Sequence, residues 1–525
     1  MAPVPIRFSV EDTSYGRRAL ELVAQRFPTH WDKVSTRHTT YYDTLDWRIF
    51  RTDQVLFAYS DGRSKFLQLD GTDGRVRYRS RLATKPGFVW ELPAGPLREE
   101  LQPILELRRL LALFTVEVRA ETLNILDERQ KTVARIRLET ATAHPARGEA
   151  PSSALPIRLA AMPVRGYDAD FDRLIQLLTE ELQLGRTEES EYRQAATAAG
   201  MEPGDYSPKL RVQLDPSARA DESVKAVLQH LLFVIRANED GLRRQIDTEC
   251  LHDFRVAVRR TRSALTQIKG IYPPAVVDRF KTEFSWLGQI TGPARDLDVY
   301  QLKMREYRAA LPEHMGSDLG SLQDFLDRHQ QTGYGELSLL LDTERYGFLL
   351  GEWQEFLDLP VPTDTDLPEA TTPILDLASR RIWKSYRRVL KKGNAITPDT
   401  PPEALHRLRI ECKKLRYLLE FFRSLFDTEA IGAPIGALKQ LQDNLGDFND
   451  LEVQQATLRQ YGQAMVAEQT ATAESLMAMG RLVDHLERRQ LEERQLFHQR
   501  FPEFANRQNR RRFQRLFKPQ EKAGA

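Results

Sequence analysis

LHDFRVAVRRTRSALTQIKG, residues Leu251–Gly270, returns later in the sequence as LHRLRIECKKLRYLLEFFRS, residues Leu405–Ser424. Leu405 follows Leu251 by 154 positions, and this shift brings the polar residues of the two stretches into register. The same shift carries Asp296–Val299 onto Asp450–Val453. Because chance does not maintain one offset with charges preserved in kind, residues from about 215 to 510 are interpreted as two copies of one helical unit.

Each copy of the repeated stretch predicts an α-helix with a cationic stripe beside an apolar face. Like charges four residues apart, as in Arg255–Arg259 and Arg409–Lys413, destabilise a helix by a few tenths of a kcal/mol, so an anion is expected nearby. The stripes comprise His252, Arg255, Arg259, Arg262 and Lys269 in the first copy and His406, Arg409, Lys413, Arg416 and Arg423 in the second, with Arg260 and Lys414 beside them.

Two interpretations of the stripes are open. In the structural one, the cations form a solvated face or pair with acidic residues of the bundle such as Asp296 and Asp298. In the functional one, they line a groove for a polyanion, because the planar guanidinium binds phosphate through two hydrogen bonds and lysine supplies a compact charge. The two interpretations are compatible, since Asp296 and Asp450 could orient part of the stripe.

The helix predicted to open the second copy, Ile374–Lys392, adds further cations. No acidic residue occurs between Ser379 and Lys392. A solvated face is again the structural alternative. The basic residues of this helix that are predicted to join the binding surface are Arg380, Arg381, Lys384, Arg387, Arg388 and Lys391.

Length and composition limit the class of protein. A chain of 525 residues predicts two to four domains. Its formal net charge of +1 conceals basic residues that are concentrated on particular helices. Cys250 and Cys412 are too few for a disulfide framework or a cysteine metal site, which favours a reducing, cytoplasmic location. The sequence shows no apolar run of membrane-spanning length and no signal peptide at its N-terminus, so no membrane partner is expected.

The predicted fold class is α+β, with a β-rich part preceding an all-helical part. Residues 1–200 contain short β-rich segments separated by turn residues, together with helices predicted at Tyr15–Arg26, Leu101–Leu113 and Asp170–Leu182. A proline-containing linker, 201–220, leads to the helical part at 221–510. Its two repeats are placed at 221–357 and 374–510. Residues 511–525 form a basic tail, predicted as either a helix end or a flexible arm.

The motifs LHDFRVAVRRTRSAL and LHRLRIECKKLRYLLEFF, with the later segments RDLDV and NDLEV, resemble the CHAD domain. The resemblance covers roughly residues 215–510. It implies two pseudo-symmetric four-helix bundles whose basic helices line a shared surface, binding of inorganic polyphosphate, and association with polyphosphate granules. Carried over residue by residue, it points to His252, Arg255, Arg259, Arg260, Arg262, His406, Arg409, Lys413, Lys414 and Arg416.

Residues 1–200 resemble the CYTH domain through Tyr41–Thr44 and Ile136–Glu139. That family hydrolyses triphosphates in a β-tunnel and holds divalent metal through glutamates of the first strand. This chain departs there, because Arg7 and Ser9 occupy the two glutamate positions. Hard divalent cations need carboxylate oxygens, so a catalytically degenerate tunnel is predicted. Weak anion binding is considered for Arg75, Arg77, Arg119 and Arg137.

The sequence therefore predicts a non-enzymatic protein that binds polyphosphate along a basic groove, with no catalytic or metal-ligating residue and no required cofactor. Whether magnesium or calcium bridges protein and ligand is left open, as is the oligomeric state. One alternative is a metal-dependent triphosphatase that uses Glu11, Asp43 and Glu139. Another is nucleic-acid binding, which is disfavoured because the stripes lack interleaved aromatic residues for stacking on bases.

Overall fold

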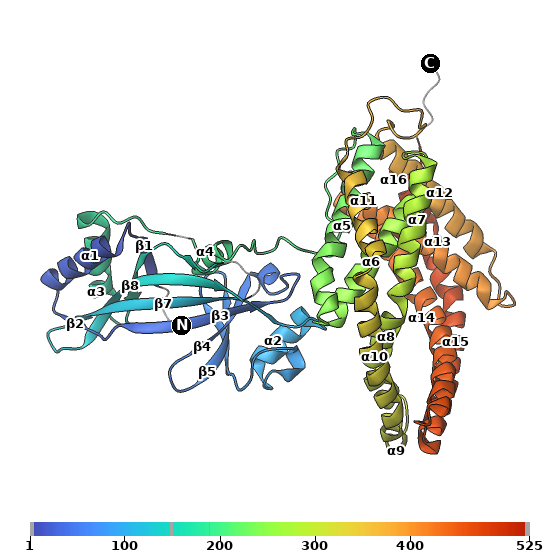
Figure 1. The fold of residues 1–525 in the computed structure, drawn as a ribbon. Helices are drawn as coiled ribbons and strands as arrows, with labels where there is room; N and C mark the ends of the chain where they lie inside the picture. The colour runs from blue at the N-terminus through green and yellow to red at the C-terminus, as the bar shows by residue number, and fades with distance from the viewer. Residues whose placement is uncertain (1–4, 147–150, 188, 520–525) are drawn as a thin grey trace. The chain divides into compact units, whose positions relative to one another are not determined.

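The computed structural model describes residues 5–146, 151–187 and 189–519. The chain divides into two compact units, Met1–Ser207 and Pro208–Ala525. The first unit is built on an antiparallel sheet and the second is helical (Figure 1). Of the helices within the described ranges, none combines the length and apolar character that crossing a lipid bilayer requires.

The first unit contains a ten-stranded antiparallel sheet with the order β1-β10-β8-β7-β3-β4-β5-β6, in which β2 also pairs with β7 and β9 with β8. The strands β1, β3, β4, β6, β7 and β8 correspond to the β-rich segments predicted from the sequence, which are Ile6–Val10, Arg37–Tyr42, Val55–Tyr59, Arg75–Tyr78, Thr115–Ala120 and Thr132–Thr140. The strands β2, β5, β9 and β10 were not predicted. The strands are β1 (Ile6–Ser9), β2 (Thr29–Trp31), β3 (Ser35–Asp43), β4 (Gln54–Ser60), β5 (Lys65–Gly71), β6 (Val76–Arg81), β7 (Leu111–Leu126), β8 (Thr132–Pro145), β9 (Ser153–Ala154) and β10 (Arg158–Pro163).

Helices cover the sheet because its strands alternate apolar and polar side chains. The helices α1 (Thr13–Arg26) and α3 (Asp168–Gln176) share a core with apolar residues of β1, β7, β8 and β10, including Phe8, Ile136 and Leu138. The helix α4 (Glu191–Ala198) contacts β7 and β8. We call the face that carries Arg7, Arg137 and Tyr41 the α4 face.

The predicted helix Leu101–Leu113 is wrong over its second half. The helix α2 (Pro96–Leu105) stops before Glu106, because the positive φ of 50° at Glu106 is incompatible with a continuing right-handed helix. The chain then enters β7 at Leu111, where Leu111 and Leu113 are buried in the alternating pattern of a strand. The leucines of this segment fit a helical and a strand period equally well, so periodicity alone does not decide between them.

The second unit consists of helices that correspond between the two copies of the repeat. Consecutive helices pack on one another in both copies, α5–α6–α7 and α12–α13–α14, and α6 also contacts α13. The symmetry of two complete bundles stays a prediction. The helices are α5 (Ala220–Arg243), α6 (Thr248–Gln267), α7 (Pro274–Ile290), α8 (Gly292–Ala309), α9 (Glu313–Gly316), α10 (Gly320–Leu341), α11 (Glu344–Asp358), α12 (Ile374–Asn394), α13 (Pro402–Phe421), α14 (Thr428–Ala467), α15 (Ala473–Ala505) and α16 (Arg507–Phe517).

The copies differ where the first has two helices, α7 and α8, and the second has the single helix α14 of 40 residues. The break in the first copy falls at Thr291, just before Gly292 and Pro293. A shift by 154 positions replaces Pro293 with Asp447, which can donate the backbone hydrogen bond that proline lacks. A core of buried side chains from α8, α10, α14 and α15 joins the two copies.

The basic segment near the C-terminus is a helix. In α16, Phe513 and Phe517 are buried, and the ring of Phe513 stacks on Tyr386 of α12 with a centroid distance of 3.8 Å. The arginines of α16 therefore lie on a helix that is packed against the second repeat, although the sequence left a helix end and a flexible arm as alternatives. The last residues of the chain, 520–525, lie outside the described ranges.

Candidate functional site

A cavity of about 600 Å³ lies between helices of both repeats. Its lining includes Arg259 and Arg262 from α6, Lys281 from α7, and Lys413 and Lys414 from α13. Among the described residues that line it, none is acidic. Basic side chains from the two copies of the repeated helix thus face one common space.

A second, more enclosed cavity of about 260 Å³ adjoins the first, and Thr266, Gln267 and Lys414 line both. It lies between α6, α12 and α13, three helices that Figure 1 shows within the helical unit. Its basic lining residues are Lys269, Arg381, Lys384, Arg388 and Lys414. We call the two adjoining cavities, defined by these lining residues, the basic groove.

The cations of the larger cavity are poorly neutralised by the protein itself. Arg259, Arg262 and Lys413 form no ion pair with a carboxylate in the part of the chain that the structure describes. Burial, together with the neighbouring charges of Arg409 and Arg259, lowers the pKa of Lys413 to about 8. Crowded positive charge of this kind favours an external anion.

Among the described residues that line the smaller cavity, Glu411 supplies the one carboxylate, and this residue is 7% exposed. Its Oε1 accepts from Lys392 Nζ at 2.9 Å and from Lys414 Nζ at 3.2 Å, while its buried Oε2 has no hydrogen-bond partner. Arg381 donates to the Lys269 carbonyl oxygen at 2.7 Å, which ties α12 to the end of α6. Glu411 therefore positions Lys414, the lysine that both cavities share.

The two histidines of the repeated motif each contact a later helix of their own copy, α8 for His252 and α14 for His406. His252 Nδ1 lies 3.0 Å from an Arg295 guanidinium nitrogen, and His406 Nδ1 lies 2.6 Å from Asn449 Oδ1. Arg295 and Asn449 are themselves equivalent under the shift of 154 positions. Neither histidine lines the basic groove, and the equivalent contacts indicate a shared role in holding neighbouring helices together.

Several arginines predicted to bind the ligand form hydrogen bonds or ion pairs within the protein. Arg255 donates to the Gly288 carbonyl oxygen at 2.9 Å and to Thr291 Oγ1 at 2.7 Å, and burial lowers its pKa to about 10. Arg409 Nη2 lies 3.1 Å from Asp450 Oδ1. Two further predicted arginines pair with the carboxylate of Glu420, Arg260 at 2.8 Å and Arg416 at 2.7 Å. The structural alternative, pairing with internal acids, therefore describes part of the stripe.

Other predicted residues lie outside the basic groove. Arg380 forms an ion pair with Glu369. The exposed side chains of Arg387, Lys391 and Arg423 line neither cavity. The structure thus brings together Arg259, Arg262, Lys269, Arg381, Lys384, Arg388, Lys413 and Lys414 from the predicted set.

Sequence reasoning missed Lys281 and the acidic residues that organise the site. Lys281 lies on α7, and the shift of 154 positions places Ile435 at the equivalent position, so the repeat gives no signal for it. The acidic residues Glu411 and Glu420 lie within the basic motif on α13, three residues before Lys414 and four residues after Arg416 respectively. That spacing could have indicated their pairing with Lys414 and Arg416.

On the α4 face of the first unit, the carboxylates of Glu139 and Glu191 form ion pairs with an arginine. Arg158, only 4% exposed, pairs with Glu139 at 3.1 Å and also with Glu191 of α4. The pairing of β8 with β10 sets Arg158 directly opposite Glu139, and directly opposed residues share a face. Arg137 lies on the same face, and burial lowers its pKa, as do the nearby charges of Arg37 and Arg135.

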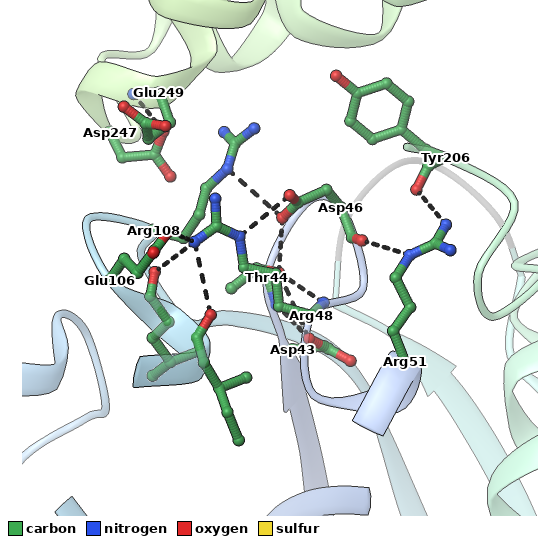
Figure 2. A network of polar contacts seen from close by, with 12 residues as sticks. Asp43, Thr44, Asp46, Arg48, Arg51, Glu106, Arg108, Tyr206, Asp247 and Glu249 are labelled. Carbon is green, nitrogen blue, oxygen red and sulfur yellow. Dashed lines mark hydrogen bonds and ion pairs between the residues drawn. The ribbon is translucent and has the colours of Figure 1, made fainter. Parts of the chain in front are cut away.

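Asp43, a candidate metal ligand, caps a turn instead. Its carboxylate accepts from the backbone N–H groups of Thr44, Ile49 and Phe50 at 2.7–2.9 Å. Figure 2 shows this turn beside the ion pair of Asp46 with Arg48, whose nitrogen and oxygen are 3.1 Å apart. Burial raises the pKa of Asp43 to about 7. The family-like segment Tyr41–Thr44 therefore builds the end of β3.

A divalent metal does not fit this arrangement. Within the described ranges, no group of three or more His, Cys, Asp or Glu side chains is placed to hold a metal ion. Of the three candidate ligands, Glu11 is exposed, Asp43 caps the turn and Glu139 is held by Arg158. The three carboxylates considered for metal-dependent triphosphate hydrolysis are therefore not brought to one site.

The four arginines considered for weak anion binding are not brought to one site. Arg119 is exposed and lies opposite Thr140, whereas Arg137 lies opposite Thr122 on the other face of β7. Arg75 approaches Asp73 at 3.6 Å. A cavity of about 560 Å³ on the α4 face has Arg7, Tyr41, Asp70 and Arg193 in its lining and none of those four arginines.

These features define an α-helical domain in which a duplicated helix supplies basic side chains to one groove. Residues 226–459 match the family model of the CHAD domain, so the chain contains a CHAD domain. The match covers the repeated helix in both copies and ends within α14.

Two uncharacterized proteins, from two strains of Mycobacterium tuberculosis, are each 30% identical to the chain over 178 residues, which is 32% of this chain. The chain spans 33% of the length of these relatives. The crystal structure of the CHAD domain from the plant Ricinus communis has 27% identity and a TM-score of 0.45, covering 55% of this chain and 96% of its own.

An adenylyl cyclase-like protein from Hippeastrum, described with a dominant triphosphatase activity, has 12% identity and a TM-score of 0.26. That likeness covers 39% of this chain and all of its own. The family assignment accordingly rests on the CHAD match and applies to the helical unit.

Proposed function

We propose that the helical unit binds inorganic polyphosphate in the basic groove. The observation that carries this proposal is the convergence of unpaired cations from both copies of the repeat, Arg259 and Arg262 on α6 and Lys413 on α13, on one cavity. The CHAD domain at residues 226–459 supports the same ligand class.

The groove matches a linear polyphosphate in charge and in donor chemistry. Each phosphate along such a chain carries about one negative charge and presents oxygen acceptors to guanidinium and ammonium donors. The cations of the larger cavity extend into the smaller one through Lys414, so neighbouring phosphates can be bound in succession. No enzymatic step is required, and we propose that the protein associates with polyphosphate granules through this groove.

Titration of the full chain with long-chain polyphosphate at two salt concentrations tests the proposal. Binding that neutralises several phosphates releases counterions, so the affinity should fall steeply as the salt concentration rises. An affinity that does not depend on salt would contradict binding through the groove cations.

Competition separates polyphosphate from nucleic acid. Tyr417 is the one aromatic residue among the described residues that line the groove, whereas single-stranded nucleic acid is usually bound through several stacking platforms. Single-stranded DNA at an equal phosphate concentration should therefore displace polyphosphate poorly. Displacement at equal concentration would favour a nucleic-acid ligand instead.

A further inference from the structure

The two cavities of the basic groove differ in how densely they present positive charge. Five basic side chains line each cavity, but the volumes are about 600 Å³ and about 260 Å³. The same number of cations thus surrounds less than half the space in the smaller cavity. Its cations lie on α12 and α13 and at the end of α6, and Lys414 connects them to the larger cavity.

The phosphates of a linear polyphosphate are chemically of two kinds. An internal phosphate has one ionised oxygen and continues through a bridging oxygen on each side. A terminal phosphate has a second ionisable oxygen with a pKa of about 6, so at neutral pH it carries close to two charges. It also needs space for the chain on one side only. A small cavity with dense positive charge therefore favours a chain end over an internal phosphate.

The wall of the smaller cavity supports this distinction. Glu411 is buried there between Lys392 and Lys414 and places one negative charge beside the ligand space. Because Lys392 and Lys414 pair with that charge, it is compensated within the wall, and the other cations of the cavity attract a single dianionic group. The larger cavity has no acidic residue among the described residues in its lining and accepts consecutive internal phosphates.

We propose that the cavity between α6, α12 and α13 is a subsite for the terminal phosphate of a polyphosphate chain, with Lys384, Arg388 and Lys414 as its ligands and the larger cavity holding the phosphates that follow. This inference rests on the proposed function of the basic groove and adds a preference for chain ends.

Ring-shaped polyphosphates test the subsite because they have no ends. Linear tetrapolyphosphate and cyclic hexametaphosphate carry the same full negative charge, so a general electrostatic attraction treats them alike. The full chain should bind the linear compound about tenfold more tightly, the worth of one additional charged hydrogen bond. Equal affinities for the two compounds would overturn the terminal subsite.

Variants assign the preference to one cavity. The double change Lys384→Gln and Arg388→Gln should bring the affinities of the linear and cyclic compounds together. The change Arg262→Gln and Lys281→Gln in the larger cavity should weaken both compounds by a similar factor and keep their ratio. The exposed Arg387 on α12 lines neither cavity, so Arg387→Gln is the matched control and should change nothing.

The outcomes separate the two proposals. If the full chain binds long-chain polyphosphate but does not distinguish rings from chains, the terminal subsite is wrong and the proposed function stands. If long-chain polyphosphate does not bind at all, the proposed function itself is wrong. A linear preference that survives in the variant with Lys384→Gln and Arg388→Gln would place the end-binding site elsewhere and overturn its assignment to this cavity.

Discussion

The basic groove of the helical unit and the α4 face of the first unit are both rich in arginine, yet their arginines are in opposite situations. On the α4 face, the buried Arg158 is neutralised by Glu139 and Glu191 of the same unit. In the groove, Arg259, Arg262 and Lys413 form no ion pair with a carboxylate within the described ranges. The comparison indicates that nearby carboxylates, rather than the number of basic residues, decide whether those residues stabilise the fold or stay available to an external anion.

Charge reversal in the groove should have the largest effect. The triple change Arg259→Glu, Arg262→Glu and Lys413→Glu removes three cations that form no ion pair with the described carboxylates, so helix content should stay unchanged. Affinity for long-chain polyphosphate should fall by about a thousandfold, at roughly tenfold for each lost contact. Isothermal titration with circular dichroism as the folding control measures both quantities, and retained affinity would show that the groove is not the site.

Removal of the paired arginine in the first unit should act on stability instead. Arg158→Ala leaves the carboxylates of Glu139 and Glu191 without their partner, and breaking a buried ion pair from one side costs about 3–5 kcal/mol. Hydrogen exchange of the β8 and β10 amides should accelerate accordingly. Polyphosphate affinity should not change. A large loss of affinity would contradict the claim that Arg158 stabilises the fold and takes no part in ligand binding.

The pH dependence of binding tests whether the charge of Lys413 in the basic groove contributes to polyphosphate affinity. Lys413 has a pKa of about 8 in the free protein, and a bound phosphate raises it because the anion stabilises the ammonium form. Affinity is therefore full below pH 8 and declines above it, by up to about tenfold for each pH unit.

Lys413→Arg provides the matched control for this pH dependence. Arginine stays protonated throughout the range, so the decline should disappear in this variant. The charge of a long polyphosphate is nearly constant above pH 8, because almost all of its phosphates are internal and strongly acidic. A decline that persists in Lys413→Arg would assign the titration to another group.

The smallest expected effect is on hydrolysis. With tripolyphosphate and magnesium or manganese, the full chain should release no phosphate above background, because Glu11, Asp43 and Glu139 do not form a common metal site. Malachite green detection of phosphate measures this. Metal-dependent release that is lost in Glu139→Gln would show that the α4 face retains catalysis and that Arg158 does not prevent it.

The sequence predicted the elements whose pattern is strong. The duplicated stretch predicted α6 and α13, because the same charges recur at helical spacing in both copies. It failed at Leu101–Leu113, where leucine spacing fits either a helix or a strand. It also missed β5, although Asp61-Gly62 and Asp73-Gly74 flank that strand as turn signals, and it missed β10.

For the site, helical spacing identified most of the groove cations but could not separate them from their neighbours. Arg255, Arg259 and Arg262 lie on one stripe of α6, yet Arg255 is directed to the backbone of α7 and the other two line the cavity. That distinction depends on how α7 packs beside α6, and the residue spacing within a single helix does not predict this packing. The same limit applies to Lys281, which only the packing of α7 brings to the groove.

Lysine footprinting of the full chain tests the central claim most directly. Acetylation with and without long-chain polyphosphate, read by mass spectrometry, reports which ammonium groups the ligand covers. Polyphosphate should protect Lys281, Lys384, Lys413 and Lys414, which line the groove, and leave the exposed Lys439 of α14 reactive. Equal protection of Lys439, or no protection of the groove lysines, would contradict binding in the basic groove.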